Sequence, residues 1–162
     1  MTNTLASSIL GFGVLVLSTL LANAQNNPEI IIKQGDTIEW VSVPNAPHKV
    51  RFGGSGSGAT SFDVVKDLLD FDPTTPIMHD PNNPDPTTFD SAQKPSGTLL
   101  KAKVKETDGV IGKTFVFICG VHGGQMLSYA FKIEAKGAGG ARNYRILGEP
   151  AINWHLHIDT TP

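Results

Sequence analysis

The chain of 162 residues contains a single cysteine, Cys119, and this scarcity limits what the protein can be. One thiol cannot form a disulfide within the chain, so in an oxidising compartment it must be buried, paired with another chain or bound to a metal ion. A basic excess is also lacking, because 13 lysines and arginines stand against 15 acidic residues and give a formal charge of −2. A protein without a basic surface is not a candidate for nucleic-acid binding.

Charged side chains are absent from residues 1–24, MTNTLASSILGFGVLVLSTLLANA. The apolar run at 9–21 is too short to span a bilayer comfortably, and the tripeptide ANA at 22–24 offers the small residues that signal peptidase selects. We therefore expect a signal peptide over 1–24, cleaved before Gln25, and export to the periplasm, the extracellular space or a thylakoid lumen. Because Lys and Arg are missing near the N-terminus, an uncleaved anchor that associates the protein with a membrane is the alternative.

Sustained helical periodicity is missing as well, whereas short alternating runs recur. β-Branched and aromatic residues indicate strands at 29–33 (EIIIK) and 36–43 (DTIEWVSV). Further runs with a period of two occur at 49–52, 99–104, 113–118 and 127–134. The 17 glycines and 11 prolines favour turns between the runs. The pattern predicts one all-β domain, a sandwich or Greek-key barrel, with at most a short helix at 62–69.

The stretch 53–97 interrupts the strand pattern and is interpreted as a long loop insertion in a domain over 25–136, which a C-terminal extension at 137–162 follows. Seven aspartates and two lysines give the insertion a charge of −5, which leaves +3 on the rest of a chain whose total is −2. Such aspartates typically cap turns beside prolines in a solvated loop. A calcium site is the alternative, although the glycine and the terminal glutamate of an EF-hand loop are missing.

An imidazole and a thioether follow the single cysteine within FICGVHGGQM, residues 117–126. A metal ion that alternates between Cu(I) and Cu(II) is served by a soft thiolate, imidazoles and a weak axial thioether. Cys119, His122 and Met126 offer three of these donors. A second imidazole must come from elsewhere, and the turn NAPH, which follows an expected strand, favours His48.

The segments GDTIEWVSVPNAPHKVRF and FVFICGVHGGQMLSYAFKI together resemble the plastocyanin and azurin family of small blue copper proteins, the cupredoxins. The resemblance covers roughly residues 28–52 and 97–135. It implies a Greek-key β-sandwich that holds one type 1 copper ion near one end. The ligands that it implies, three equatorial and one axial, are His48, Cys119, His122 and Met126.

Three features depart from the family pattern. The spacing Cys-x2-His-x3-Met lies between those of plastocyanins and amicyanins, and Gln125 is an alternative axial ligand. Lys49 stands where the family commonly has an asparagine that ties the two ligand loops together, so the surroundings of the thiolate differ from the family's. The insertion 53–97 and the tail after Lys136 have no counterpart in the smallest members.

Two other chemistries use the same residue types. Zinc binds cysteine and histidine, but a structural zinc ion usually takes four strong ligands and rarely accepts methionine. A cysteine hydrolase would pair Cys119 with His122, yet such pairs are usually distant in sequence and oriented by Asn or Asp. Copper fits the donors best.

The tail contains a second pair of histidines in WHLH, residues 154–157, which resembles the His-x-His pairs of multicopper oxidases. In a strand, the apolar residues of the tail would face the core, and His155 and His157 would face away from it. The core-facing residues would be Ile152, Trp154, Leu156 and Ile158. Because Cys119 lacks the flanking histidines of a trinuclear cluster, an exposed edge strand is expected, with an auxiliary metal site completed by His79 or another chain as the alternative.

The sequence therefore predicts an exported, mononuclear type 1 copper protein that carries single electrons, rather than an enzyme. The family resemblance implies partners such as a c-type cytochrome or a copper or haem oxidoreductase, docking near His122. The acidic insertion 53–97 is expected to form a negative surface region that steers a basic partner. Changing Asp80, Asp85 and Asp90 to Asn would test whether it does. The alternatives are a copper enzyme or enzyme subunit that reacts with a small molecule such as nitric oxide, similar to nitrosocyanin, and copper storage or delivery.

Overall fold

The computed structural model describes a part of the chain that is built mainly from β-strands. The described residues are 27–45, 47–81, 83–123, 126, 128–150 and 153–159. Strand accounts for 46% and helix for 8% of the structure, which confirms the predicted all-β class. The expected signal peptide at 1–24 lies outside the described residues. None of the helices within them is long and apolar enough to cross a membrane.

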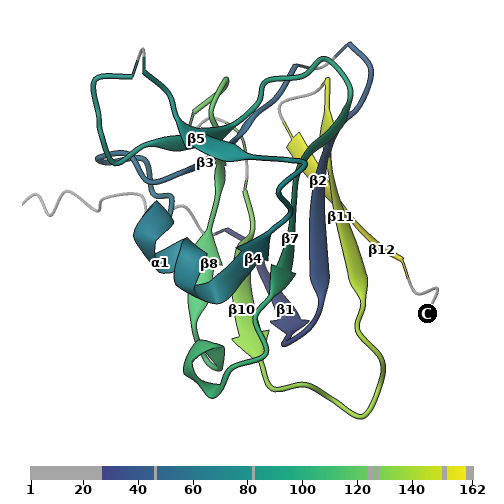
Figure 1. Cartoon of the computed structure of the whole chain (residues 1–162). Coiled ribbons are helices and arrows are strands. Elements are labelled where there is room, and N and C mark those ends of the chain that lie inside the picture. The colour runs from purple at the N-terminus through teal and green to yellow at the C-terminus, as the bar shows by residue number, and fades with distance from the viewer. Residues whose placement is uncertain are drawn as a thin grey trace, which may run out of the picture.

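Twelve strands occur in the described part of the chain (Figure 1). They are β1 (Glu29–Lys33), β2 (Thr37–Ser42), β3 (Val50–Phe52), β4 (Leu69–Phe71), β5 (Ile77–His79), β6 (Phe89–Ser91), β7 (Gly97–Val104), β8 (Thr114–Val116), β9 (Ile118–Cys119), β10 (Ala130–Glu134), β11 (Asn143–Glu149) and β12 (Asn153–Asp159). The helical segments are α1 (Phe62–Leu68) and the 3-10 turn η1 (Asp108–Val110). The short helix expected from the sequence is therefore confirmed.

The strands form three sheets. The five-stranded sheet has the order β12-β11-β2-β7-β4, the three-stranded sheet β1-β10-β8 and the four-stranded sheet β5-β6-β3-β9. Two pairs are parallel, β1 with β10 and β2 with β11. Parallel neighbours cannot be joined by a tight turn, so each of these pairs joins distant parts of the chain. The C-terminal tail thereby becomes the direct neighbour of β2, in the middle of the largest sheet.

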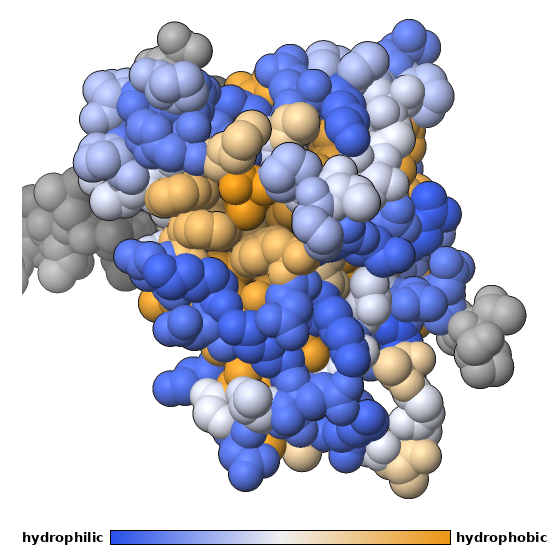
Figure 2. Space-filling model, in the orientation of Figure 1, coloured by the Kyte–Doolittle hydropathy of each residue, from blue (hydrophilic) through white to orange (hydrophobic). Residues whose placement is uncertain are grey.

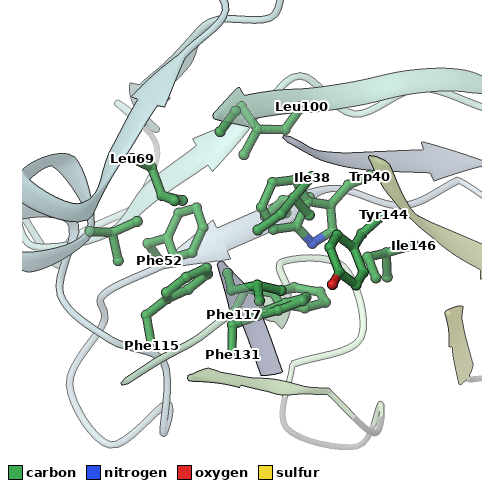
Figure 3. Packing of buried hydrophobic residues seen from close by; sticks show 14 of the residues in the cluster. Ile38, Trp40, Phe52, Leu69, Leu100, Phe115, Phe117, Phe131, Tyr144 and Ile146 are labelled. Atoms are coloured by element: carbon green, nitrogen blue, oxygen red, sulfur yellow. The ribbon is translucent and has the colours of Figure 1, made fainter. Parts of the chain in front are cut away.

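The five-stranded sheet packs face to face against the other two sheets through aromatic side chains (Figure 3). The ring of Trp40, on β2, lies 6.3 Å from the rings of both Phe52 and Phe131, measured between centroids. Phe117 lies 5.5 Å from the same indole, and all four rings are fully buried. Burial of such large rings in edge-to-face pairs supplies much of the free energy that holds the layers together. This is the arrangement expected of a β-sandwich.

The insertion 53–97 differs from the solvated loop expected from the sequence, because it contributes strands to two sheets. β4 pairs with β7 at the edge of the five-stranded sheet, and the β5–β6 hairpin extends the four-stranded sheet beside β3. Apolar side chains gather between α1 and β5 on the face shown in Figure 2, and Phe62 stacks on Phe89 with ring centroids 4.3 Å apart. These apolar residues are scattered among many aspartates, prolines and glycines, so the composition of the stretch conceals them.

Two Asp-Pro-Thr-Thr segments of the insertion form the same kind of turn. Asp72 Oδ1 accepts hydrogen bonds from the amide and hydroxyl groups of Thr74, at 2.8 and 2.6 Å. Asp85 Oδ1 accepts the equivalent bonds from Thr87 at 2.9 and 2.6 Å, and the Ser55 amide donates to its other oxygen. These bonds, the one from the Thr87 hydroxyl foremost, lower the pKa of Asp85. The prediction that aspartates cap turns beside prolines is confirmed.

The C-terminal tail forms a hairpin in which β11 lies between β2 and β12, and β12 forms the sheet edge. Trp154 is buried, whereas His155 and His157 are exposed, so the predicted edge strand with two outward histidines is confirmed. The expectation that Ile158 faces the core is wrong, because this side chain is exposed. Burial decreases along β12 from the buried Trp154 through the half-buried Leu156 to the exposed Ile158. Ile152 lies outside the described residues.

Candidate metal centre

Strand pairing brings the two predicted ligand segments together. β3 and β9 are antiparallel with Val50 opposite Cys119, so His48, two residues before Val50, comes to lie beside the cysteine. The Gly120 amide donates a hydrogen bond of 2.9 Å to the Lys49 carbonyl, which links the two segments a second time. Backbone hydrogen bonds therefore set the position of His48 relative to the thiol.

Three of the four predicted ligands converge on one point. The Cys119 sulfur lies 3.5 Å from His48 Nδ1 and 3.3 Å from His122 Nδ1. All three donor atoms lie within 4.8 Å of one another. Two donors that share an ion through bonds of about 2.0 to 2.3 Å at a near-tetrahedral angle are roughly 3.5 Å apart. These side chains are close enough to bind one metal ion with one sulfur and two nitrogens.

The second ring nitrogen of His48 is held by the backbone of the tail. His48 Nε2 lies 3.0 Å from the Glu149 carbonyl oxygen, which can only accept a hydrogen bond, so Nε2 carries the proton. The neutral ring then directs the lone pair of Nδ1 toward the Cys119 sulfur. Burial lowers the pKa of His48, the bond to Glu149 opposes this, and the neighbouring His122 lowers it further. Burial and the neighbouring His122 each lower the pKa of His48, and both therefore favour the neutral form of the ring, which is the form that binds a metal ion.

His122 comes from a loop that turns back onto the cysteine. The Gly123 amide donates a hydrogen bond of 2.8 Å to the Cys119 carbonyl, and Gly123 has a φ of 60°, which glycine adopts without strain. His122 is only half-buried, in contrast to the fully buried His48, and its neighbour Val121 is exposed. The site therefore reaches the protein surface at His122.

Met126 and Gln125 are the two alternatives for an axial ligand. Met126 is fully buried and belongs to the same apolar cluster as Cys119. Its amide lies 3.5 Å from the Gly123 carbonyl, so the backbone at Met126 returns to the ligand loop. Gln125 lies outside the described residues. The axial role of Met126 stays a prediction, and its burial suits an uncharged thioether.

Lys49, which departs from the family pattern, belongs to a charged cluster beside the site. Its ammonium nitrogen lies 2.7 Å from an Asp90 oxygen and 3.4 Å from an Asp80 oxygen. Arg51 donates two hydrogen bonds of 2.7 Å to the Asp90 carboxylate, and these bonds raise the pKa of Arg51. The stem of Lys49 covers Gly120, because a methyl group added to that glycine would lie 2.7 Å from Lys49 Cε. Lys49 and Asp90 thus lie directly against Gly120, the residue that follows the cysteine.

This cluster corrects part of the expectation that the aspartates of the insertion form an exposed acidic surface, because Asp90 is buried and Asp80 is half-buried. The side chain of Asp90 is only 5% exposed, and its charge is paired with both Lys49 and Arg51. Asp80 is half-buried next to Lys49. The expectation is wrong for Asp90 because its partner Arg51 lies 39 positions away in the sequence, beyond the reach of any local pattern.

The remaining histidines do not join a second group of three metal-binding side chains among the described residues. His155 Nε2 lies 3.5 Å from a Glu149 side-chain oxygen at the sheet edge. His79 is on β5, in a different sheet, with its Nε2 3.3 Å from the Asp85 carbonyl. The auxiliary site with His79 is therefore not formed within the described part of one chain. Three carboxylates close enough to share a calcium ion are also absent from that part.

Two residues of the C-terminal tail contact His48, and the sequence did not predict a role in the site for either of them. The Trp154 ring lies 5.1 Å from the His48 ring, between centroids, and Gly148 lies directly against the same imidazole. A glycine inside a strand pattern is a signal for close approach of another group to the backbone. That signal exists at Gly148, but it does not say which group approaches.

No family model matches the sequence, and neither the curated proteins nor the solved structures include a significant match to it. The interpretation of the site therefore depends on its own residues and distances.

Proposed function

We propose that the protein is an exported type 1 copper protein of the cupredoxin class, which carries one electron at a time between redox partners. The observation that carries the proposal is the buried Cys119 sulfur, placed 3.5 Å from His48 Nδ1 and 3.3 Å from His122 Nδ1. A thiolate with two imidazoles is the equatorial donor set of blue-copper sites. In this proposal Met126 is the weak axial donor.

The β architecture is compatible with the Greek-key sandwich that the sequence resemblance implies. The parallel pairs β1–β10 and β2–β11 tie early and late parts of the chain into both layers. Cys119 ends β9 in one layer, and Glu149, whose carbonyl faces His48, ends β11 in the other. The two layers therefore hold the donors jointly, as a rigid electron-transfer site requires.

A copper ion bound there would supply the Cu(I)/Cu(II) couple. The protein holds the donors still, since Cys119 is fixed by its pairing with Val50 and His48 by its hydrogen bond to Glu149. Because these donors would keep their positions when the charge of the site changes, electron transfer would require little rearrangement of the protein. A partner such as a c-type cytochrome or a copper or haem oxidoreductase would approach at the half-buried His122, through a small and transient contact.

The burial of the donors favours this function over the alternatives. A copper enzyme that reacts with nitric oxide, like nitrosocyanin, needs an open position, and storage or delivery needs ready exchange of the metal. Cys119 and His48 are fully buried, which opposes both. A hydrolase nucleophile must reach its substrate, which the buried thiol does not. Azide or nitric oxide added to the copper-loaded protein separates carrier from enzyme, because a closed site keeps its spectrum.

Titration of the protein with copper(II), followed by visible and EPR spectroscopy, tests the proposal. We expect one copper ion per chain and an intense thiolate-to-copper absorption, with zinc(II) as the colourless control. Cys119→Ser should abolish the absorption. Met78→Leu, which removes an exposed sulfur, should leave it unchanged. A wild-type protein that stays colourless, or colour that persists in Cys119→Ser, would refute the proposal.

A further inference from the structure

We infer that the C-terminal strands β11 and β12 are part of the metal centre, where they position His48 as an Nδ1 donor. The inference deepens the proposed function and rests on it. Three contacts, each from a different residue of these strands, converge on the one imidazole. They involve the absent side chain of Gly148, which leaves room for the ring, the carbonyl of Glu149 and the indole of Trp154.

Gly148 provides the space in which the imidazole lies. A methyl group added to Gly148 would come within 2.6 Å of His48 Cδ2 and 2.9 Å of the Trp154 ring. Gly148 is paired with Ser42 of β2 on one side and with Trp154 of β12 on the other. A strand held by neighbours on both sides cannot move aside, so any larger residue must displace the imidazole or the indole.

Trp154 covers the ring of His48. The two rings are 5.1 Å apart at an angle of 44°, and Trp154 is itself wedged against Phe117 at 5.4 Å. The Tyr129 hydroxyl donates a hydrogen bond of 2.8 Å to the Trp154 carbonyl, which ties β12 to the segment that follows the ligand loop. As a result His48 is only 1% exposed, so water does not compete for its ring.

The Glu149 carbonyl fixes the tautomer. It accepts the Nε2 proton of His48 at 3.0 Å, so the nitrogen that faces the sulfur is the unprotonated Nδ1. Metal-bound histidines characteristically donate their other ring proton to such an acceptor, which orients the ring and makes it a better ligand. Because the acceptor belongs to the backbone, it acts whatever side chain stands at position 149.

The first test changes the space around the ring. In Gly148→Ala we expect copper(II) affinity, measured by competition with a chelator, to fall at least about tenfold and the EPR spectrum to change. Gly139→Ala is the matched control, because a methyl group at Gly139 meets no atom within 4 Å. It should bind copper as the wild type does. Circular dichroism of both metal-free variants shows whether they are folded.

The second test removes the ring and replaces it from solution, since a backbone carbonyl cannot be mutated. In His48→Gly, imidazole should restore the colour of the copper(II) protein. N-methylimidazole, which has no proton for the Glu149 carbonyl and places a methyl group against it, should do so at least about tenfold less effectively. In His122→Gly the two compounds should act alike, because the described residues offer no hydrogen-bond partner to the second nitrogen of His122.

Each outcome is decisive. Wild-type affinity and spectra in a folded Gly148→Ala, or equal rescue of His48→Gly by both compounds, overturns the inference. If Gly148→Ala does not fold, the comparison of the two compounds decides alone. A wild-type protein that never develops the copper colour refutes the proposed function instead, so the two failures are distinguishable.

Discussion

Asp90 is the residue that connects the insertion to the surroundings of the candidate metal centre. Its carboxylate binds Lys49, which directly precedes β3, and Arg51, which lies within β3. Val50, between these two residues, pairs with Cys119. The Val50 amide also donates a hydrogen bond of 3.0 Å to the Ser91 hydroxyl, next to Asp90. A change at Asp90 should therefore be felt in both the fold and the site.

Asp90→Asn should lower stability and raise the reduction potential of bound copper. Lys49 and Arg51 lose their common partner, and breaking a largely buried ion pair costs about 3 to 5 kcal/mol. Removing a negative charge near the metal favours Cu(I), the less positive state. Urea unfolding and redox titration measure the two effects.

Asp63→Asn is the control for this change, because Asp63 pairs with Lys66 in an exposed position. The control should alter the free energy of unfolding far less than Asp90→Asn does and leave the potential unchanged. A potential in Asp90→Asn equal to that of the wild type would show that the charged cluster does not influence the metal.

At the level of elements, α1 shows that the insertion is part of the fold rather than a flap. Two consecutive valines of this helix face opposite ways, since Val65 is fully buried in the core cluster and Val64 is 46% exposed. The C-terminal residue of α1, Leu68, is buried too, and its carbonyl accepts a hydrogen bond from the Lys105 amide after β7. The helix is therefore anchored both to the apolar core and to the segment that follows β7.

Val65→Ala should destabilise the metal-free protein by about 2 kcal/mol, through the lost apolar contact and the cavity left behind. Val64→Ala is its matched control, because it makes the same chemical change in the same helix at an exposed position. It should change the free energy of unfolding by no more than about 0.5 kcal/mol. Equal effects of the two substitutions in urea unfolding would mean that α1 does not pack on the core in solution.

The ligands of the site were more accessible to sequence reasoning than their surroundings. Cys119 and His122 are close in sequence, and a turn after a strand was enough to suggest His48. Gly148 and Trp154 meet His48 only because β11 pairs with β2, a contact across about a hundred residues that no local pattern encodes. The strands of the insertion were missed for a similar reason. Its turn-forming residues outnumber the few apolar side chains that pack against the core, and a local pattern does not show which of them pack there.

At the scale of the whole molecule, the proposed function makes the surface near His122 the place where a redox partner would meet the protein. Val121 beside it is 40% exposed and uncharged. The negative charges of Asp80 and Asp90 would attract a basic partner only weakly, because both carboxylates are paired with Lys49. We therefore expect electron exchange with a c-type cytochrome to depend weakly on ionic strength and strongly on the apolar contact at Val121.

Val121→Asp should slow electron exchange with such a cytochrome about tenfold, measured by stopped-flow absorbance, because a charge is placed in an apolar contact. Ile111→Asp serves as the control. Ile111 is 41% exposed, much like Val121, but it directly follows η1 and does not belong to the ligand loop. It should leave the rate unchanged. A steep decrease of the wild-type rate with salt, or equal rates for the two variants, would place the docking surface elsewhere.

The pairing of β11 with β2 also dictates an order of events during synthesis. His48 and the Glu149 carbonyl that orients it are 101 residues apart, so the ribosome completes one long before the other. Contacts between such distant segments form late and slowly during folding. Until the last strands have docked, β2 has an unpaired edge and His48 has neither its fixed tautomer nor its cover. Under the proposed function, copper would therefore be captured in its final geometry only after β11 and β12 have docked, and a chain truncated before β11 would leave the imidazole open to water.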